Sequence, residues 1–142
     1  MCSGEGSAFM IEYRITLDGI NPEDLKGFFV GWKKPLTPGE HYTILKNSSF
    51  IVLAYDKEKS KVVGFINALS DGVNFAFIPM LEVLPEYQHK GIGSNLFKMM
   101  LKRLENITCI DLTCDIQMQG FYERFGMLQS HGMVFRKYLK QD

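Results

Sequence analysis

The amino-acid sequence predicts a single domain of the α/β (α+β mixed) class, in which helices flank a central sheet that is mixed and mostly antiparallel. Two observations predict this fold. Three β-rich runs follow one another with only short turns between them, which makes them antiparallel neighbours. The second half of the chain then alternates strand, helix and strand, and such a crossover makes its two strands parallel. A length of 142 residues fits one domain, so we expect residues 1–142 to form a single unit.

The first third of the chain predicts one strand and two short helices. From Phe9 to Leu17 apolar residues mostly alternate with polar ones, which is typical of a half-buried strand. Asn21-Pro22 is a helix start, with asparagine as the N-cap and proline in the first turn. Thr37 and Glu40 have the spacing of a capping box and predict a second start. We therefore expect two short helices within residues 22–46.

The remaining elements follow from the apolar pattern and from turn residues. After Gly93, apolar side chains recur at helical spacing as far as Leu104, with charged residues on the opposite side. Gly126 is a helix-ending residue. The other predicted elements are strands at 50–55, 62–69, 73–84 and 107–114, a short helix at 118–125 and a final strand at 132–139.

Composition excludes several classes of protein. Hydrophobic residues make up 46% and charged residues 23%, as in globular domains rather than disordered chains. Sixteen basic residues balance sixteen acidic ones without a basic stripe, so we expect no nucleic-acid partner. No apolar run has the length of a membrane span, and the N-terminus does not resemble a secretory signal. Three cysteines without metal spacing indicate no metal site and reduced thiols in the cytoplasm; they are Cys2, Cys109 and Cys114.

The segment Tyr87–Ser94, which reads Tyr-Gln-His-Lys-Gly-Ile-Gly-Ser, lies where a predicted strand meets a predicted helix. Gly91 and Gly93 allow a tight turn and a close approach of the backbone to a ligand. The N–H groups of a helix N-terminus, together with the helix dipole, form an anion site. The segment matches neither of the two common nucleotide phosphate loops.

This segment resembles the Q/R-x-x-G-x-G/A motif of the GNAT (GCN5-related N-acetyltransferase) superfamily, with Gln88, Gly91 and Gly93 at the matching positions. The motif follows a β-run and opens an amphipathic helix, as it does in the family. Further on, Phe121–Met127 resembles the family's L/F-Y-x-x-x-G-F signature. The resemblance covers most of the chain and has its core at about residues 73–127. It implies the GNAT acyl-CoA N-acyltransferase fold.

The resemblance implies where acetyl-CoA binds. The backbone at 88–94 would hold the pyrophosphate, and the end of the preceding strand would pair with the pantetheine arm between two diverging strands. Pro79 either removes a ladder donor there or marks a bulge or an edge position. Asp115 stands where the family often has an asparagine that contacts the pantetheine. The predicted cofactor-binding residues are Val83, Leu84, Gln88, His89, Lys90, Gly91, Ile92, Gly93, Ser94 and Asp115.

Two side chains are candidates for catalysis. Tyr122 matches the family's catalytic tyrosine and would act as the general acid that protonates the departing thiolate; the alternative is a tyrosine that only contacts CoA or packs. Glu82 shares a strand face with apolar residues, so it would have a raised pKa or line a wet cleft and would serve as the general base. Its alternative is a carboxylate satisfied by a neighbouring arginine or by backbone groups.

The acceptor pocket would be built from the early helices and loops, as in the family. Phe29, Trp32, His41 and Tyr42 are its candidate residues, and core packing is the alternative for this aromatic cluster. The predicted function is an acetyl-CoA-dependent N-acetyltransferase acting on an amine of a small molecule or peptide by direct attack in a ternary complex. The alternative is a catalytically silent acyl-CoA-binding module on the same fold. The predicted partners are acetyl-CoA and an amine, with no membrane; GNAT domains often pair, so a homodimer through the final strand is also considered.

Overall fold

The computed structural model describes residues 10–139 of the chain. Their backbone divides into two compact units, which meet between Leu112 and Thr113, and each unit is described by itself. The first unit contains, in chain order, β2 (Ile11–Arg14), the 3₁₀ helix η1 (Pro22–Leu25), α1 (Pro38–Lys46), β3 (Phe50–Asp56), β4 (Lys61–Ser70), β5 (Phe75–Val83), the 3₁₀ helix η2 (Pro85–Tyr87), α2 (Ile92–Arg103) and β6 (Cys109–Asp111).

Within the described residues the strands form one five-stranded sheet in the order β2-β3-β4-β5-β6. The first four strands are antiparallel neighbours, and β6 runs parallel to β5 after the α2 crossover. Short turns and a βαβ crossover produce these two kinds of pairing, as expected from the sequence. The mixed, mostly antiparallel sheet with flanking helices is therefore confirmed.

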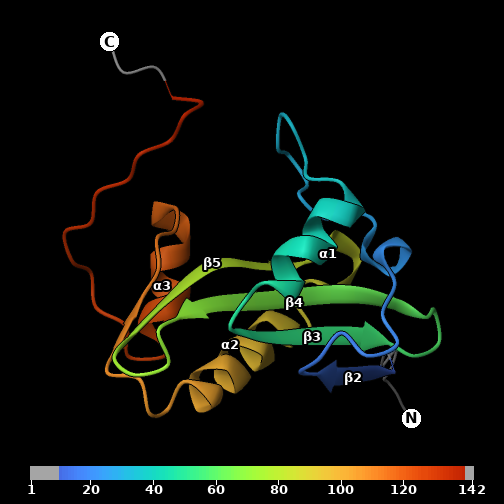
Figure 1. Cartoon of the computed structure of the whole chain (residues 1–142), viewed down its shortest axis with the longest axis horizontal. Helices are drawn as coiled ribbons and strands as arrows, with labels where there is room; N and C mark the ends of the chain where they lie inside the picture. Colours follow the sequence, from blue (N-terminus) through green and yellow to red (C-terminus); the bar gives the residue numbers. More distant parts are fainter. Residues whose placement is uncertain (1–9, 140–142) are drawn as a thin grey trace. The chain divides into compact units, whose positions relative to one another are not determined.

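The two α-helices of this unit lie on opposite faces of the sheet (Figure 1). A Cβ atom at Gly64 of β4 would lie 3.1 Å from Leu96 of α2, so the missing side chain lets α2 sit close to the strand. The next residue, Phe65, points to the other face and stacks on His41 of α1 with ring centroids 4.3 Å apart. Side chains alternate between the faces of a strand, so β4 forms the centre of both cores. Its residues from Val62 to Ala68 are all buried.

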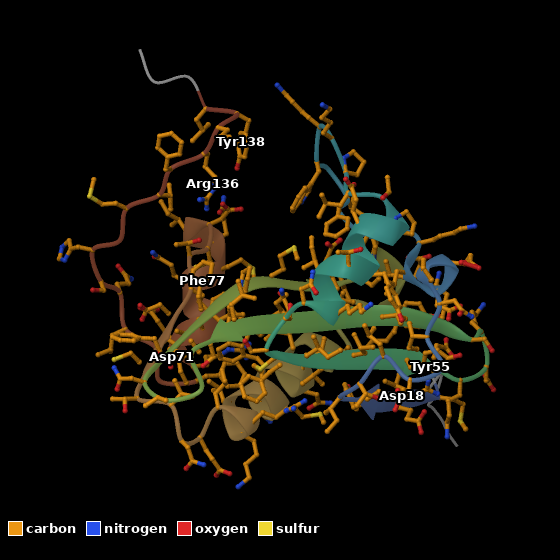
Figure 2. The ribbon with its side chains drawn as sticks, viewed as in Figure 1. Asp18, Tyr55, Asp71, Phe77, Arg136 and Tyr138 are labelled. Atoms are coloured by element: carbon orange, nitrogen blue, oxygen red, sulfur yellow. The ribbon has the colours of Figure 1, made fainter. Side chains whose placement is uncertain are left out.

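The capping box predicted at Thr37 and Glu40 is present, whereas Asn21 is the N-cap residue of η1 without a side-chain capping hydrogen bond. Thr37 accepts a hydrogen bond from the Glu40 backbone N–H (3.1 Å), and the Glu40 carboxylate accepts from the Thr37 N–H (2.9 Å). At the β4–β5 turn, the Asp71 carboxylate accepts from the N–H groups of Val73, Asn74 and Phe75, which lowers its pKa. Figure 2 shows Asp71 in this turn and Phe77 further along β5.

The second unit contains the 3₁₀ helix η3 (Ile116–Met118) and α3 (Gln119–Glu123), and the turn that follows α3 reaches Gly126 with φ +92°. This confirms the short helix that was predicted near 118–125. The prediction of a strand at 132–139 is wrong, because these residues form no strand in the structure. Alternation of apolar and polar residues permits a strand, but a strand also needs a hydrogen-bonding neighbour.

Several element boundaries differ from the predicted ones. The first strand covers Ile11–Arg14 rather than 9–17, and Phe9 lies outside the described residues, as does Cys2. The strand predicted at 107–114 is reduced to Cys109–Asp111, and the first predicted helix is a single 3₁₀ turn. In residues 10–139 no helix is long and apolar enough to cross a membrane. The same residues contain no cluster of three or more histidine, cysteine or acidic side chains that would hold a metal ion.

Candidate active site

Strand β5 loses its neighbour on one side at the point where the site was predicted. It pairs with β6 only from Phe75 to Phe77, while β5 continues to Val83. A register shift also occurs here, because Ile78 and Pro79 of β5 together face the single residue Ala68 of β4. Such a bulge bends a strand and increases its twist. Pro79 therefore lies at a bulge, and beyond it the β5 edge opens within this unit.

The backbone of Val83 points to this open edge. The Leu84 N–H donates to the Val63 carbonyl of β4 at 2.8 Å. Since consecutive residues of an antiparallel strand point their N–H and C=O groups to opposite sides, the Val83 groups are directed away from β4. The Val83 carbonyl indeed accepts from the Gln88 side chain at 2.9 Å. Leu84 is buried and its carbonyl accepts from the Tyr87 N–H, so Val83 rather than Leu84 presents backbone to the edge.

The predicted anion loop leads from η2 directly into α2. His89 has φ +64° and Gly91, the N-cap of α2, has φ +85°. The first hydrogen bond of the helix runs from the Asn95 N–H to the Gly91 carbonyl at 3.0 Å. The N–H groups of Ile92, Gly93 and Ser94 precede that bond and are therefore the N-terminal donors of the helix. An anion placed there would also meet the positive end of the α2 dipole.

The two glycines of the motif have different roles. A Cβ atom at Gly91 would meet no atom within 4 Å, so the loop is open there, and only the left-handed backbone conformation requires glycine. A Cβ atom at Gly93 would lie 3.8 Å from the Val83 side chain, which is ordinary contact. The exposed side chains of Gln88, His89 and Lys90 surround the loop. The loop therefore has room for a ligand at its backbone.

Glu82 is held by the loop that contains Phe29. Both of its carboxylate oxygens accept from the Phe29 backbone N–H, at 3.0 and 2.9 Å. Phe29 has φ +67°, and it lies between Gly27 at +98° and Gly31 at +86°. Alternating left-handed residues turn consecutive N–H groups to one side and form an anion-binding nest. Burial raises the pKa of the Glu82 carboxyl, and the hydrogen bonds from Phe29 and Val30 oppose that rise.

The aromatic candidates divide into core and surface residues. His41 is fully buried, and its ring packs edge-on against Phe28, Phe29 and Phe65 at centroid distances of 4.3 to 5.3 Å. Neither of its ring nitrogens has a hydrogen-bond partner among the described residues. Burial lowers the pKa of His41 to about 4. Core packing is thus the structural role of His41 and Phe29.

The other two aromatic candidates remain accessible. Trp32 stacks on Phe29 at 4.9 Å between ring centroids and is half exposed. Tyr42, which follows His41 on α1, is half-buried. These two side chains are therefore the ones that an acceptor molecule could contact from solvent.

In the second unit, Tyr122 lies on α3 and is half-buried, with its ring packed against Phe121 at 5.0 Å between centroids. Burial raises the pKa of Tyr122 to about 12, and the nearby Cys114 adds to this shift. The exposed Cys114 has its own pKa raised by desolvation and by Asp115, which disfavours the thiolate that a nucleophilic role would need. Asp115 is exposed and is the N-cap residue of η3.

Two features of the site were missed by sequence reasoning. The nest at 27–31 was not predicted, because Gly27 and Gly31 are four positions apart and its central left-handed residue is a phenylalanine. The contact between Tyr87 and Asp56 was missed as well, because it joins residues 31 positions apart. The structure brings together Val83, Gln88 and the start of α2 on one side of β5, and Glu82 with Phe29 on the other.

Comparison with known proteins agrees with this geometry. The model of the acetyltransferase (GNAT) family matches residues 18–127. The chain is 30% identical over 133 residues to the uncharacterized N-acetyltransferase ycf52 of Gracilaria tenuistipitata var. liui, which covers 87% of this chain and 71% of that protein. It is 27% identical over 139 residues to the chloroplastic GCN5-related N-acetyltransferase 1 of Arabidopsis thaliana, covering 92% and 69%.

A solved structure is similar over most of its length. The crystal structure of a putative acetyltransferase from Deinococcus radiodurans R1 superimposes with a TM-score of 0.88 at 40% sequence identity, and covers 91% of this chain and 90% of that one. The fold, the strand-to-helix anion loop and the family match all point to the same conclusion. The chain belongs to the acetyltransferase (GNAT) family.

Proposed function

We propose that this protein is an acetyl-CoA-dependent N-acetyltransferase that transfers the acetyl group to an amine by direct attack within a ternary complex. One observation carries the proposal: residues 83–94 join the open edge of β5 to the N-terminus of α2 in one continuous segment. An edge with outward backbone groups suits an extended amide-containing arm such as pantetheine. The helix N-terminus next to it suits a pyrophosphate.

The residues of the loop fit this cofactor. Gly91 leaves open space at its missing side chain, and the first-turn N–H groups of α2 follow directly. Gln88, which donates to the Val83 carbonyl, ties the loop to the strand edge. When bound, acetyl-CoA supplies the activated acetyl group as a thioester. The N–H of Val83, directed at the open edge, is the proposed donor to the thioester oxygen.

Glu82 is the proposed general base. Its pKa is raised by burial, which suits removal of a proton from an ammonium, directly or through water. In the structure its oxygens accept from the Phe29 backbone. An acceptor ammonium would bring N–H donors of its own to the same carboxylate. We therefore propose that the acceptor competes with the loop at 27–31 for Glu82.

Tyr122 is the proposed general acid. As the amine nitrogen forms its bond to the acetyl carbon, the carbon–sulfur bond breaks and the CoA sulfur leaves as a thiolate that takes a proton. A tyrosine with a pKa of about 12 carries its proton at every physiological pH, so it is always available as a donor. The same high pKa makes complete transfer to a thiol with a pKa near 8.5 uphill. Hydrogen bonding to the departing sulfur is thus a large part of its proposed role.

The first experiment tests binding and catalysis separately. Titration calorimetry with acetyl-CoA should show a single site per chain. A free-thiol assay with polyamines, aminoglycosides, arylalkylamines and peptide N-termini should then identify an amine that releases CoA. Absence of acetyl-CoA binding would refute the proposal as a whole.

Substitution of the proposed acid tests its role. Tyr122→Phe should lower kcat about 100-fold with the identified amine, while the Kd for acetyl-CoA stays close to the wild-type value. Tyr138→Phe is the matched control, since Tyr138 is an exposed tyrosine of the same unit, labelled in Figure 2. A wild-type kcat for Tyr122→Phe would exclude it as the acid.

The alternative is a silent acyl-CoA-binding module on the same fold, and one observation favours it. The half-buried Glu82 carboxylate already accepts from backbone donors, so it is not a free base in this structure. Such a module would bind acetyl-CoA in calorimetry and release no thiol with any amine. We further propose that the protein is cytoplasmic, which cell fractionation would test; the Arabidopsis relative carries the description chloroplastic. We also propose an amine as substrate and a second copy of the chain as partner, and light scattering would test for the homodimer.

A further inference from the structure

A buried hydrogen bond lies immediately before the anion loop. The Tyr87 hydroxyl donates to the Asp56 carboxylate at 2.6 Å, and both residues are at most 3% exposed. Tyr87 is the last residue of η2, and Asp56 is the last residue of β3, next to Tyr55, which is labelled in Figure 2. A bond from a hydroxyl to a buried carboxylate is among the stronger hydrogen bonds of a protein.

The same carboxylate also organises the turn between β3 and β4. Its other oxygen accepts from the backbone N–H groups of Glu58 and Lys59, at 3.0 and 3.3 Å. Asp56 therefore fixes a β-hairpin and the start of the anion loop to each other. The hydroxyl stays protonated at physiological pH, because burial and the neighbouring carboxylates raise the pKa of Tyr87 to about 12.

The loop that follows needs support at both ends. His89 at φ +64° is a residue with a side chain in the left-handed region, which is unfavourable and persists only when the surroundings enforce it. On the far side, α2 is fixed by Ile92 and Leu96, which approach the bare backbone of Gly64. On the near side, the buried bond from Tyr87 to Asp56 holds the chain, together with the exposed bond from the Gln88 side chain to the Val83 carbonyl.

We propose that Asp56 and Tyr87 form a positioning pair that sets the conformation of residues 88–91 for the pyrophosphate of CoA. This inference rests on the proposed function, because it assumes that CoA binds at the loop. Neither residue touches the ligand in this proposal. The pair acts by keeping the loop in its binding conformation before the ligand arrives, which reduces the ordering cost of binding.

The test compares two ligands that share the pantetheine arm. Acetyl-CoA contains the pyrophosphate and S-acetylpantetheine does not. Tyr87→Phe removes only the hydroxyl and should weaken acetyl-CoA about 10-fold, with S-acetylpantetheine changed by less than about twofold. Amide chemical shifts of ¹⁵N-labelled protein give both dissociation constants, including the weak one. In turnover, the KM for acetyl-CoA should rise while kcat is retained.

A second variant and a matched control keep the result interpretable. Asp56→Asn replaces the carboxylate by a neutral amide that keeps one oxygen for the turn, so the charge-assisted bond from Tyr87 is lost and the same preference should appear. The double variant should lose less than the sum of the single losses, since both substitutions act on that bond. Tyr13→Phe is the control, because its hydroxyl accepts from Asn95 of α2 at 3.1 Å, which lies outside residues 88–91. Thermal unfolding of each variant sets a temperature at which all are folded.

The outcomes separate the two proposals. A selective loss for acetyl-CoA supports the positioning pair. An equal loss for both ligands, or no loss for acetyl-CoA, would overturn it and leave a structural bond only. A wild-type protein that binds neither ligand would contradict the proposed function and, with it, this inference.

Discussion

The two sides of β5 use their polar backbone groups in opposite ways. On the side of the proposed cofactor site, the Val83 backbone and the first turn of α2 present hydrogen-bonding groups to an open edge. On the side of the proposed acceptor site, the loop at 27–31 turns the N–H groups of Phe29 and Val30 inward onto Glu82. Both sides contain residues in the left-handed region, at His89 and Gly91 on one and at Phe29 on the other. The same backbone conformation thus builds an open anion site and a closed one.

This difference separates an anion site made of backbone groups alone from one that holds a side chain of the protein itself. An anion site made of backbone groups needs only glycines and a helix start, so it can be the same in proteins with different substrates. A nest that is filled by the protein's own carboxylate must be emptied before Glu82 can meet an acceptor. We therefore expect changes of the backbone at the proposed cofactor site to weaken cofactor binding. At the proposed acceptor site, we expect acceptor turnover to depend on whether Glu82 is bound by the loop at 27–31.

Forcing a side chain onto the open anion site should have the largest effect. Gly91 has φ +85° with open space around it, so Gly91→Val meets no clash but must leave the left-handed region. The loop would then change its conformation, and the Kd for acetyl-CoA should rise about 100-fold. Titration calorimetry measures the change.

The chain offers a matched control for this substitution. Gly72, in the β4–β5 turn, has φ +79° and likewise no atom within 4 Å of an added Cβ. Gly72→Val should lose similar stability and keep the wild-type affinity for acetyl-CoA. Equal affinities of the two variants would show that the backbone at Gly91 does not form the site.

The geometry of the open side could be predicted from the sequence because it depends on elements that follow one another directly along the chain. A strand, two glycines and an amphipathic helix within residues 81–104 define the donors and their direction. The parallel crossover from β5 to β6 follows from the same order of elements. Each of these features is a property of neighbouring residues.

The closed side could not be predicted because it depends on contacts between distant residues. Glu82 and Phe29 are 53 positions apart, and nothing in the pattern around Phe29 indicates that a phenylalanine adopts a positive φ. Tyr87 and Asp56 are similarly distant, at 31 positions. The wrongly predicted strand at 132–139 fails for the same reason, since its pattern contains no information about a pairing partner.

Removing the Glu82 carboxylate from the loop at 27–31 should have an intermediate effect on activity. Glu82→Gln keeps the shape of the side chain but replaces one accepting oxygen with a donor, which faces the Phe29 N–H. The loop at 27–31 should loosen and the base should be lost, so kcat/KM for the acceptor should fall about 30-fold. Binding of acetyl-CoA should stay close to wild type.

The pH dependence identifies the role of this carboxylate. Because the pKa of Glu82 is raised above its ordinary value of 4.5, wild-type kcat/KM should fall as the pH decreases through that raised value. Glu82→Gln should lack this acid limb, whereas the exposed neighbour variant Glu86→Gln should keep it. An unchanged acid limb in Glu82→Gln would assign the base to another group.

The smallest expected effect concerns the aromatic cluster beneath the closed side. His41 is buried with both ring nitrogens unpartnered among the described residues, and such nitrogens cost stability. His41→Leu, which is similar in volume and favours helix, should stabilise the protein by about 1 kcal/mol at pH 7.

The pH dependence of the stability gives a second measurement on His41. The folded-state pKa of about 4 lies below the ordinary 6.5, so the unfolded chain binds the proton first as the pH falls. Wild-type stability is therefore complete above pH 6.5 and decreases toward pH 4, by at most about 3 kcal/mol. Urea unfolding at pH 7 and at pH 5 should show this loss for the wild type and a smaller one for His41→Leu. If His41→Leu were less stable than the wild type at pH 7 and equally sensitive to pH, the prediction would be wrong. The ring nitrogens of His41 would then be hydrogen-bonded to internal water, and the aromatic cluster would contain a polar site.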